Sequence, residues 1–381
     1  MTAGRRIVAA ARRRALAPGV AMRDLHDRRR IAASPLPPPG TVAVSYGVPQ
    51  MPAPGAAAAG GFVKFQRLAE AFPHEPRAFS VLYLGSSSVP PGAEALARIT
   101  RGRGARLAWN QNGVAYPAWH GPGIERVNAP MGRLLHAADH VFYQSAFCKL
   151  GADVYLSPPT GAWEILHNAV DTTRFTPAAG ASTGAPGRPL TLLLGGNQYH
   201  AYRVETALRT LALVAREVDA RLIVTGTLAW PTASGTPAAP AAALQLARKL
   251  GIVDRVTFSG PYRQDEAPAL LASASLLLHT QENDACPNLV VEALACGLPV
   301  VHSASGGVPE LVGDEAGIGV PSRSTWEEIV PPEPEALAAA VLAVASRLAE
   351  RSAAARDRAV TRFDLAPWVE RHHEVFRELV A

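Results

Sequence analysis

The residues best suited to chemistry lie in the stretch ENDACPNLVVEALACG, residues 282–297, which places the acids Asp284 and Glu292 eight positions apart. The apolar run LLLHT before it predicts a strand, and Pro287 and Asn288 mark the start of a helix. The N–H groups of a helix's first turn carry a partial positive charge that suits a phosphate or sugar oxygen. Carboxylates beside that turn would accept hydrogen bonds from hydroxyl groups. The stretch therefore favours a ligand site.

A helix cap and a metal site stay open as alternatives for this stretch. A capping box needs a Glu three residues after the cap, but with Asn288 as the cap that position is Val291. A metal site would use Cys286 and Cys296, yet no second Cys or His pair stands at ligand spacing. Packing suits both cysteines better, Cys296 in the helix core and Cys286 as a small loop residue.

Length and composition indicate a globular protein. The chain has 381 residues, 48% hydrophobic and 18% charged, which is enough for two domains with ordinary cores. No run of 18 apolar residues occurs, and the first apolar run, IVAAA, is too short for a signal-peptide core. The three cysteines lack CxxC spacing, which fits a reducing compartment. We therefore expect a cytoplasmic protein.

Residues 1–40 form a predicted Arg-rich arm that carries the chain's positive charge. Residues 1–30 hold nine Arg against two Asp, whereas the rest of the chain is slightly acidic. The arm is either a solvated leader or a peripheral patch for an anionic membrane, where each basic residue contributes about 1 kcal/mol. Nucleic acid is disfavoured, because no aromatic residues interleave with the Arg cluster. Sedimentation with anionic vesicles, with and without residues 1–30, separates the two alternatives.

From residue 41 onward, short apolar runs alternate with amphipathic helical stretches, the pattern of parallel α/β sheets. One series covers residues 41–174 and a second covers 190–362. Between them, residues 175–189, FTPAAGASTGAPGRP, have the composition of a linker. The tail is predicted to form two helices with a break near Asp364, so that 363–381 is the last helix.

Three predicted strands of the second series end in glycine, at Gly196, Gly226 and Gly260. Glycine lets the backbone turn sharply into a loop at the carboxyl edge of the sheet. Open parallel sheets bind their ligands at that edge. The stretch with Asp284 and Glu292 falls at the same edge.

Residues 287–313, PNLVVEALACGLPVVHSASGGVPELVG, resemble the retaining glycosyltransferases of family 4, which have the GT-B fold of two Rossmann-like parallel-sheet α/β domains facing across a cleft. The signature of that family is an acid, seven residues, and Glu. Here Asp284 takes the first position, more often Glu in the family, and Glu292 the second. HNAVDTTRFTP, residues 167–177, is similar to the family's crossover into the C-terminal domain. The resemblance covers roughly residues 41–381 and weakens toward the N-terminal end.

The resemblance implies a retaining enzyme that moves a sugar from a nucleotide-sugar donor to a glycan, lipid-linked or small-molecule acceptor. Residues 41–174 would be the acceptor-side domain, with the C-terminal helix packed on it, and 190–362 the sugar-nucleotide domain. Glu292 would hold the ribose hydroxyls, and Asp284 would contact the sugar as a catalytic residue. The other donor-binding residues implied are Pro287, Asn288, Leu289, Gly196, Asn197, Gly260, Tyr262, Gly306 and Gly307. No metal, and no cofactor beyond the donor substrate, is expected.

One departure concerns the basic residues that neutralise the diphosphate. The family usually places an Arg and a Lys after the first C-terminal strand, but here the loop reads GGNQYHAYR, with Asn197 where the Arg is expected. The single Lys of this half, Lys249, stands on another predicted helix. Arg203, beside the expected Lys position, is the predicted catalytic substitute. The alternative is that Arg203 is a solvated residue at a helix start.

On the acceptor side, Gly60 and Gly61 precede an amphipathic helix, where the family has a glycine loop. The stretch WNQNGVAYPAWHG contains Asn112, Trp119 and His120, which suit sugar stacking and hydroxyl recognition. His120 is the best candidate for a polar catalytic aid, and a purely structural role is its alternative.

An inverting enzyme would need a base on the face opposite the leaving group. No acid in residues 31–170 stands squarely at a predicted strand end, which favours retention. Two rival functions stay open: a sugar-nucleotide epimerase of the same fold, and a non-catalytic sugar-nucleotide or glycan-binding protein. Product analysis with one sugar nucleotide and no acceptor separates the first, and binding without hydrolysis identifies the second. Fold alone decides neither.

Overall fold

In the computed structural model, the α/β alternation forms two parallel sheets, each at the centre of its own unit. The structure describes residues 27–52, 60–177, 188–229 and 239–381, so residues 1–26 of the predicted arm lie outside it. Unit 1 comprises the described part of Met1–His167 with Trp326–Glu328 and Ala366–Ala381, and unit 2 comprises that of Asn168–Thr325 and Ile329–Leu365. Within these ranges no helix combines the length and hydropathy that a membrane span requires.

The sheet of unit 2 is entirely parallel, with the strand order β11-β10-β9-β6-β7-β8. Its strands are β6 (Leu190–Leu194), β7 (Ala220–Thr225), β8 (Val256–Gly260), β9 (Leu276–His279), β10 (Val300–Ser303) and β11 (Gly317–Val320). Side chains alternate between two cores, with Leu193 and Leu277 in one and Leu192 and Leu276 in the other. Both faces are buried, which explains the near-continuous apolar runs of these strands.

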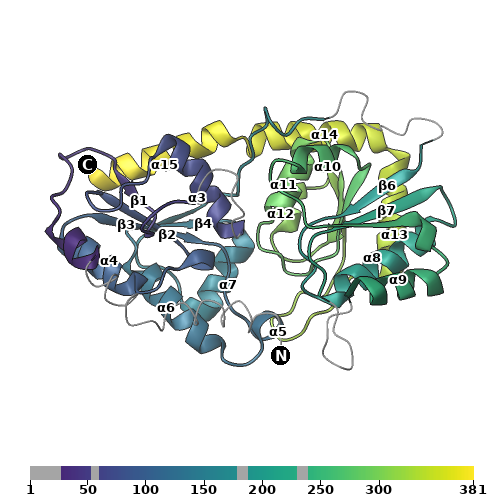
Figure 1. Ribbon diagram of the computed structural model, residues 1–381, viewed down its shortest axis with the longest axis horizontal. Coiled ribbons are helices and arrows are strands. Elements are labelled where there is room, and N and C mark those ends of the chain that lie inside the picture. Colours follow the sequence, from purple (N-terminus) through teal and green to yellow (C-terminus); the bar gives the residue numbers. More distant parts are fainter. Residues whose placement is uncertain (1–26, 53–59, 178–187, 230–238) are drawn as a thin grey trace. The chain divides into compact units, whose positions relative to one another are not determined.

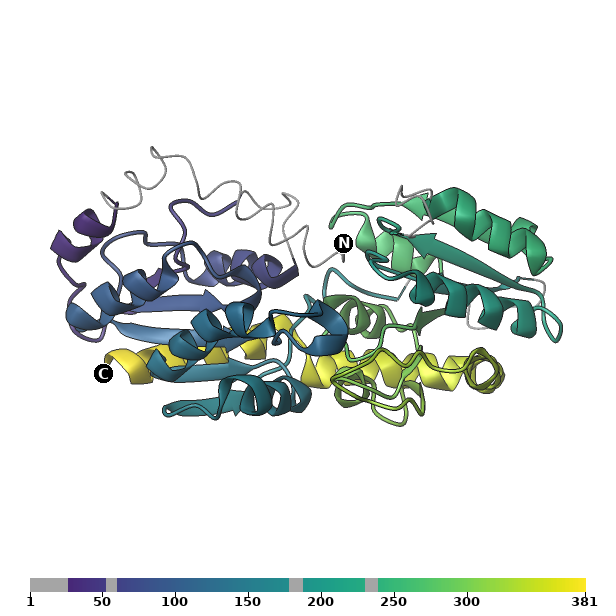
Figure 2. The same ribbon diagram turned by 90° about the horizontal axis from the view of Figure 1, so that it is seen from below.

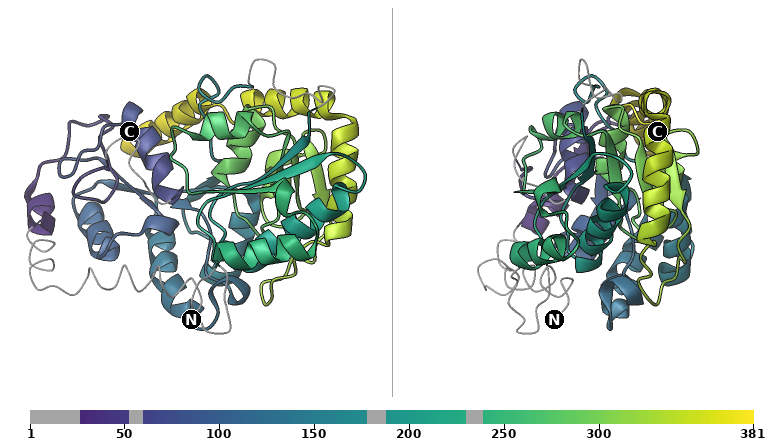
Figure 3. Two further views of the ribbon diagram at one scale, coloured as in Figure 1. Left: turned by 45° about the vertical axis from the view of Figure 1, so that its right-hand side comes forward. Right: turned by 90° about the vertical axis from the view of Figure 1, so that its right-hand side faces the viewer.

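Helices cover both faces of this sheet (Figures 1 and 3). On one face lie α8 (Ala201–Val214), α9 (Ala239–Lys249) and α13 (Pro334–Ser346). On the other lie α10 (Ala267–Ala272), α11 (Asn288–Ala295), α12 (Val308–Val312) and α14 (Leu348–Arg362). A short 3-10 turn, η2 (Val253–Arg255), leads into β8. Cys286 and Cys296 are buried in the core that also holds Leu193 and Leu277, as expected of packing residues. Burial raises the pKa of Cys296 to about 12.

The C-terminal tail forms three helices, so the prediction of two is wrong. α13 and α14 are separated at Arg347, whose φ of −128° and ψ of 34° are not helical. No Gly or Pro marks this break, because packing sets it: α13 contributes to the core of α8, and α14 to the core of α11. The predicted break near Asp364 is confirmed, since α14 ends at Arg362 and α15 (Leu365–Val380) begins just after it.

Unit 2 begins earlier than the sequence indicated. The expected boundary followed residue 174, but the residues from Asn168 onward belong to unit 2. Asn168 Nδ2 donates to the Cys286 carbonyl oxygen (2.7 Å), and Arg356 Nη1 donates to that of Phe175 (2.8 Å). These bonds hold the segment on unit 2. Of the predicted linker, residues 178–187 lie outside the described residues.

The sheet of unit 1 is also parallel, and its neighbours follow chain order. Its strands are β1 (Val44–Ser45), β2 (Val81–Gly85), β3 (Arg106–Gln111), β4 (His140–Tyr143) and β5 (Ala162–Ile165). One face carries α4 (Ala93–Gly102), α6 (Ile124–Ala137) and α7 (Ala146–Leu156), and the other carries α3 (Gly60–Ala71) and α15 (Figures 1 and 2). Two short elements, η1 (Ser86–Ser88) and α5 (Pro117–His120), follow β2 and β3. The last helix of the chain thus supplies part of a layer that unit 1 needs.

Tyr83 of β2 lies at the centre of the contact between this sheet and α15. It is fully buried, and its ring packs edge-on against Phe65 of α3 (5.1 Å between centroids) and Phe376 of α15 (5.5 Å). Phe72, at the end of α3, also packs edge-on against Phe376 (5.3 Å). Aromatic pairs in this geometry add to the hydrophobic contribution of their burial.

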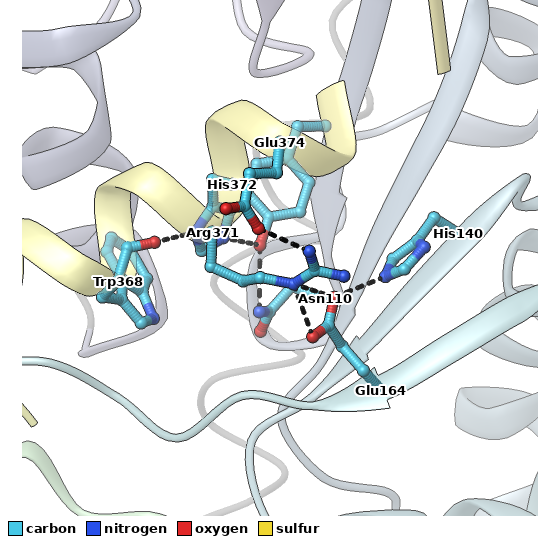
Figure 4. A network of polar contacts seen from close by, with 8 residues as sticks. Asn110, His140, Glu164, Trp368, Arg371, His372 and Glu374 are labelled. Atoms are coloured by element: carbon cyan, nitrogen blue, oxygen red, sulfur yellow. Dashed lines mark hydrogen bonds and ion pairs between the residues drawn. The ribbon is translucent and has the colours of Figure 1, made fainter. Parts of the chain in front are cut away.

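A buried chain of hydrogen bonds runs through the same contact, and Figure 4 shows most of it. Lys64 Nζ donates to Asn110 Oδ1 (2.5 Å), and Asn110 Nδ2 donates to the Tyr83 hydroxyl (3.1 Å). His372 Nδ1 lies 2.8 Å from the Trp368 carbonyl oxygen, which only accepts, so Nδ1 carries the proton. Burial lowers the pKa of His372 to about 3 and keeps the ring neutral. His372 Nε2 therefore accepts from the Tyr83 hydroxyl (3.0 Å).

Glu164 of β5 fixes α15 from a second side (Figure 4). Its carboxylate accepts from Arg371 Nε (3.0 Å) and lies 3.1 Å from His140 Nε2. Arg371 Nη1 also donates to Glu374 of the same helix (2.6 Å). Burial alone would raise the pKa of Glu164, but the bonds from His140 and Arg371 lower it overall. The carboxylate is thus held ionised.

We predict that His372 makes the stability of the protein depend on pH. Its folded pKa lies below its unfolded value, so the unfolded chain binds a proton first as the pH falls. The free energy of unfolding should therefore decrease below about pH 6.5, by up to about 1.4 kcal/mol per pH unit. His372→Gln, whose amide can accept from Tyr83 and donate to Trp368, should flatten this slope by about one proton in urea titrations between pH 4 and 6.

His373→Gln, on the same helix with a side chain 32% exposed, is the matched control and should keep the wild-type slope. Equal slopes for wild type and His372→Gln would contradict the assignment of a neutral, buried His372.

Candidate functional site

The strand order of unit 2 places a topological switch point between β6 and β9. The chain leaves β6 toward β7 on one side and reaches β9, β10 and β11 on the other. The helices that follow β6 and β9, α8 and α11, therefore pack on opposite faces of the sheet. Open parallel sheets bind their ligands at such a point. The loop after β6 begins at Gly195, where an added Cβ would lie 2.5 Å from Leu289 Cδ2 of α11. The glycine run of this strand end therefore admits the start of α11.

The glycines that end β6, β7 and β8 all adopt the positive φ that the sequence analysis expected of sharp turns, 79° at Gly196, 81° at Gly226 and 72° at Gly260. They lie against one another: an added Cβ on Gly226 would lie 2.1 Å from the Gly196 carbonyl oxygen, and Gly226 N donates to that of Gly260 (2.7 Å). The three loops form one layer of backbone at the carboxyl edge.

Helix α11 begins at Asn288, as predicted, and no side chain caps it. Its N-cap is Pro287, and Glu292 stands one turn further on, so the capping-box alternative is not realised. Gly297, with φ of 72°, follows the last turn and ends the helix as expected. The first-turn N–H groups of Asn288 and Leu289 remain available for an oxygen ligand.

The backbone of Asp284 is clamped against the loop after β10. Gly307 N donates to the Asp284 carbonyl oxygen (2.8 Å). Gly306 has φ of 72°, and an added Cβ there would lie 2.5 Å from the same oxygen. Asn283, with φ of 50°, accepts the sharp bend just before Asp284. Gly306 and Gly307 thus allow a close backbone approach to Asp284.

Glu292 is buried on α11, with 5% of its surface exposed. Its Oε1 accepts from Gln264 Nε2 (3.2 Å), and the Gln264 carbonyl oxygen accepts from Arg174 Nη2 (2.9 Å). Burial, with a smaller effect from Glu292, raises the pKa of Tyr262 to about 12. Gln264 therefore orients the carboxylate, a role that no sequence pattern indicated.

Arg203 is a buried cation, with 4% of its surface exposed, so the alternative of a solvated residue is wrong. Its Nη1 donates to the Asn197 carbonyl oxygen (2.8 Å), and within the described residues its buried Nε has no hydrogen-bond acceptor. Burial lowers the pKa of Arg203, and the negative charge of Asp284 opposes that shift. A buried guanidinium with an unused N–H suits an anionic ligand.

Asn197 serves as a brace between two loops. Its Oδ1 accepts from Thr227 N (2.9 Å), and its Nδ2 donates to the Tyr199 hydroxyl (3.0 Å). It links the loops after β6 and β7, and only its backbone carbonyl contacts Arg203. The Asn197 side chain thus stabilises the loops, at the position where the family resemblance led us to expect an Arg.

In unit 1, three predicted acceptor-side residues, Asn112, Trp119 and His120, follow β3, and the other two, Gly60 and Gly61, lie in α3. Asn112 N donates to Ser86 Oγ (2.9 Å), Asn112 Nδ2 donates to Ser87 Oγ (2.6 Å), and its Oδ1 lies 3.4 Å from Lys64 Nζ. Trp119, 37% exposed, and His120 close the short helix α5. His120 Nδ1 is buried and has no hydrogen-bond partner within the described residues. Gly60 and Gly61 are the first two residues of α3, so they lie in its first turn and not in a loop before it.

Trp326, from the segment between β11 and α13, belongs to unit 1 and packs against α5. Its ring stacks on Phe147 (4.9 Å between centroids) and packs edge-on against Tyr116 (5.1 Å) and Tyr155 (5.8 Å). Its carbonyl oxygen accepts from Ala118 N (2.8 Å). Sequence reasoning missed this residue, and the single Trp in the polar run SRSTWEE was the available signal.

The described residues hold no group of three or more His, Cys, Asp and Glu side chains arranged to bind a metal ion. The predicted site residues fall into two groups. Unit 2 carries Asp284, Glu292, Arg203, Pro287, Asn288, Leu289, Gly196, Asn197, Gly260, Tyr262, Gly306 and Gly307. Unit 1 carries His120, Asn112, Trp119, Gly60 and Gly61.

Comparison with known proteins finds a family match that lies mostly in unit 2. Residues 188–347 match the family profile described as glycosyl transferases group 1. The chain is 32% identical over 158 residues to the D-inositol 3-phosphate glycosyltransferase of Mycolicibacterium gilvum, covering 40% of this chain and 34% of that protein. It is 34% identical over 110 residues to the N-acetyl-alpha-D-glucosaminyl L-malate synthase of Bacillus anthracis, covering 29% and 26%. The chain thus aligns with about a third or less of the length of these relatives.

Solved structures show the fold over most of the chain. Sucrose-phosphate synthase from Thermosynechococcus elongatus superimposes with a TM-score of 0.62 at 18% identity, over 84% of this chain and 77% of that one. Anabaena HepE in complex with UDP superimposes with a TM-score of 0.63 at 17% identity, over 83% and 81%. The two parallel-sheet α/β units are those of GT-B glycosyltransferase structures, as the resemblance predicted.

We predict that Gly306→Ala destabilises unit 2 more than a matched glycine substitution. Gly251 has a similar φ, 70°, but open space around its Cβ position, so Gly251→Ala carries backbone strain alone, about 1 kcal/mol. Gly306→Ala adds a collision with the Asp284 backbone and should lower the free energy of unfolding by about 3 kcal/mol or more. Urea unfolding followed by circular dichroism measures both, and equal losses would show that the clamp on Asp284 is loose.

Proposed function

We propose that the protein is a glycosyltransferase that uses a nucleotide-sugar donor bound at the carboxyl edge of unit 2. The observation that carries the proposal is the buried Arg203, whose Nε has no acceptor within the described residues, near a carboxylate at the switch point. A buried guanidinium with an unmet N–H costs stability until an anion binds it. The match of residues 188–347 to group 1 glycosyl transferases supports the same assignment.

Each residue of this edge has a role in the proposed complex. Arg203 and the uncapped N–H groups of Asn288 and Leu289 would bind the diphosphate. Glu292, oriented by Gln264, would accept hydrogen bonds from the ribose hydroxyls. Asp284 would hold the transferred sugar by its hydroxyls. Pro287, Gly196, Gly260, Tyr262, Gly306 and Gly307 would shape the backbone around the donor, with Asn197 as the brace.

We propose that transfer retains the anomeric configuration. In this scheme the departing phosphate takes the acceptor's proton, while Arg203 and the start of α11 stabilise the growing negative charge. Five of the acids in residues 31–170 are already engaged in unit 1, which supports the absence of a dedicated base. They are Glu75, Glu94, Asp139, Asp153 and Glu164, bonded to the Arg77 backbone, Arg133, the Leu107 backbone, Lys149 and Arg371, respectively.

The acceptor is proposed to be a glycan, a lipid-linked sugar or a small hydroxylated molecule. In unit 1, Trp119 would stack on a sugar ring, and Asn112 and His120 would contact hydroxyls, with His120 as a polar aid to transfer. Two relatives are named for D-inositol 3-phosphate and L-malate, small hydroxylated acids, which favours the small-molecule class. A cytoplasmic location, with the basic arm at a membrane surface, stays a prediction.

Two rival functions make different predictions. An epimerase would interconvert sugar nucleotides in the absence of an acceptor, and a binding protein would bind them without consuming them. Incubating each sugar nucleotide alone and then with candidate acceptors separates all three outcomes. The match to group 1 glycosyl transferases favours transfer over both.

We predict that one class of nucleotide sugar stabilises the wild-type protein in a thermal-shift panel of UDP-, GDP-, ADP- and TDP-sugars. At a hundredfold excess over Kd, binding adds about 2.7 kcal/mol to the free energy of unfolding. Glu292→Gln, which removes the charge that would hold the ribose, should lose most of this shift. Glu335→Gln, at the start of α13, is a control that should keep it. A ligand that stabilises wild type and Glu292→Gln equally would refute the assigned site.

A further inference from the structure

His279, the last residue of β9, lies against the Asp284 carboxylate. Its Nε2 is 3.2 Å from Asp284 Oδ2, and the two side chains are 3% and 21% exposed. The contact is close enough for an ion pair but is not aligned as a hydrogen bond. Such contacts in ligand-free sites often become aligned only in the complex.

The rest of the loop leaves Asp284 little freedom except in its side chain. Asn283 N donates to Ser305 Oγ (2.9 Å), and Gly307 N donates to the Asp284 carbonyl oxygen (2.8 Å). Asn283 Nδ2 also donates to the Thr325 carbonyl oxygen (2.9 Å). With the backbone fixed on both sides, only the two side-chain torsions of Asp284 decide where its carboxylate points.

His302 of β10 stands in register beside His279 but has a different partner. Its Nδ1 donates to the Ser303 carbonyl oxygen (2.8 Å), and burial lowers its pKa to about 4. His302 is therefore neutral near pH 7 and is turned to its own strand. It gives the chain a matched control, a second buried His on the next strand that makes no ion pair with the carboxylate.

The other charged groups around Asp284 are Arg203 of α8 and Glu282 of the same loop. The negative charge of Asp284 acts on the pKa of Arg203. The hydrogen bond from Arg203 Nη1, however, goes to the Asn197 carbonyl oxygen. Glu282 accepts from Val330 N (2.5 Å). Within the described residues, His279 makes the single ion-pair contact of the Asp284 carboxylate.

We propose that His279 is a positioning residue for Asp284, an inference that rests on the proposed function. The contact of the His279 imidazole with Asp284 Oδ2 fixes the carboxylate, so that Oδ1 is free to accept a hydrogen bond from a hydroxyl of the transferred sugar. An Asp has a single methylene, so its carboxylate stays near the strand end, within reach of His279. The residue acts through Asp284 and does not itself contact the donor.

The test compares three variants of His279. Gln places its amide nitrogen near the position of Nε2, whereas Asn is shorter and cannot reach Oδ2. With the donor class found in the thermal-shift panel, we expect His279→Gln to keep kcat within about threefold of wild type. His279→Asn should lose about tenfold in kcat with a smaller change in donor KM, as for a lost hydrogen bond to a charged group. His279→Leu should behave like His279→Asn.

A double-mutant cycle identifies the partner. Because His279 acts through Asp284, His279→Asn combined with Asp284→Asn should be no worse in kcat than Asp284→Asn alone. His302→Asn should leave kcat unchanged. Additive losses in the cycle, equal losses for His279→Gln and His279→Asn, or a tenfold loss in His302→Asn would each overturn the proposal.

The same cycle in thermal unfolding without ligand separates this proposal from the proposed function. His279→Asn and Asp284→Asn should lower Tm non-additively, whether or not any sugar nucleotide is turned over. Non-additive Tm values without turnover of any sugar nucleotide would count against the proposed function and support the contact. Additive Tm values would overturn the contact itself, even if transfer is observed.

Discussion

The hydrogen bond from Gly307 N to the Asp284 carbonyl oxygen is the interaction on which the candidate site depends. It is possible because Gly306 has no side chain, so the loops after β9 and β10 can touch through backbone atoms. With Asp284 fixed, the chain enters α11 at Asn288 through Pro287 and without a side-chain cap. The same contact thus fixes the backbone that carries the Asp284 carboxylate, and helix N–H groups stay open at the switch point.

The charged groups at the carboxyl edge of unit 2 suit the binding of a ligand but lower the stability of the ligand-free protein. Arg203 is buried, uses Nη1 on Asn197, and has no acceptor for Nε within the described residues. Burying a charged group with an unmet hydrogen bond is unfavourable, and functional sites are where such costs persist. An anionic diphosphate would accept the hydrogen bond that Arg203 Nε does not make, while Glu292 and Asp284 would accept hydrogen bonds from hydroxyl groups. In unit 1, by contrast, the buried His372 and the partly buried Glu164 are bonded within the fold. His120 of that unit has a buried Nδ1 without a partner in the described residues.

Local sequence patterns predicted the parts of this site that depend on local chemistry. Glycines at strand ends, the helix start at Asn288 and the two acids could be placed because turns, caps and charges have sequence signatures. Gln264 and Trp326 could not, because their roles come from neighbours far apart in the chain. His279 is close to Asp284 in the sequence, but its contact depends on the conformation of the loop, which has no sequence signature. The break at Arg347 and the unit boundary before Asn168 were missed for the same reason: packing and long-range hydrogen bonds set them.

A crystal structure of the protein soaked with UDP, GDP or ADP would show where the diphosphate binds. We expect the diphosphate at the start of α11, with oxygens in hydrogen-bond distance of the Arg203 guanidinium and the Leu289 N–H, and the ribose hydroxyls on Glu292. A nucleotide bound away from the β6–β9 switch point would contradict this expectation. So would one bound there while Arg203 contacts only Asn197 and Glu292 only Gln264.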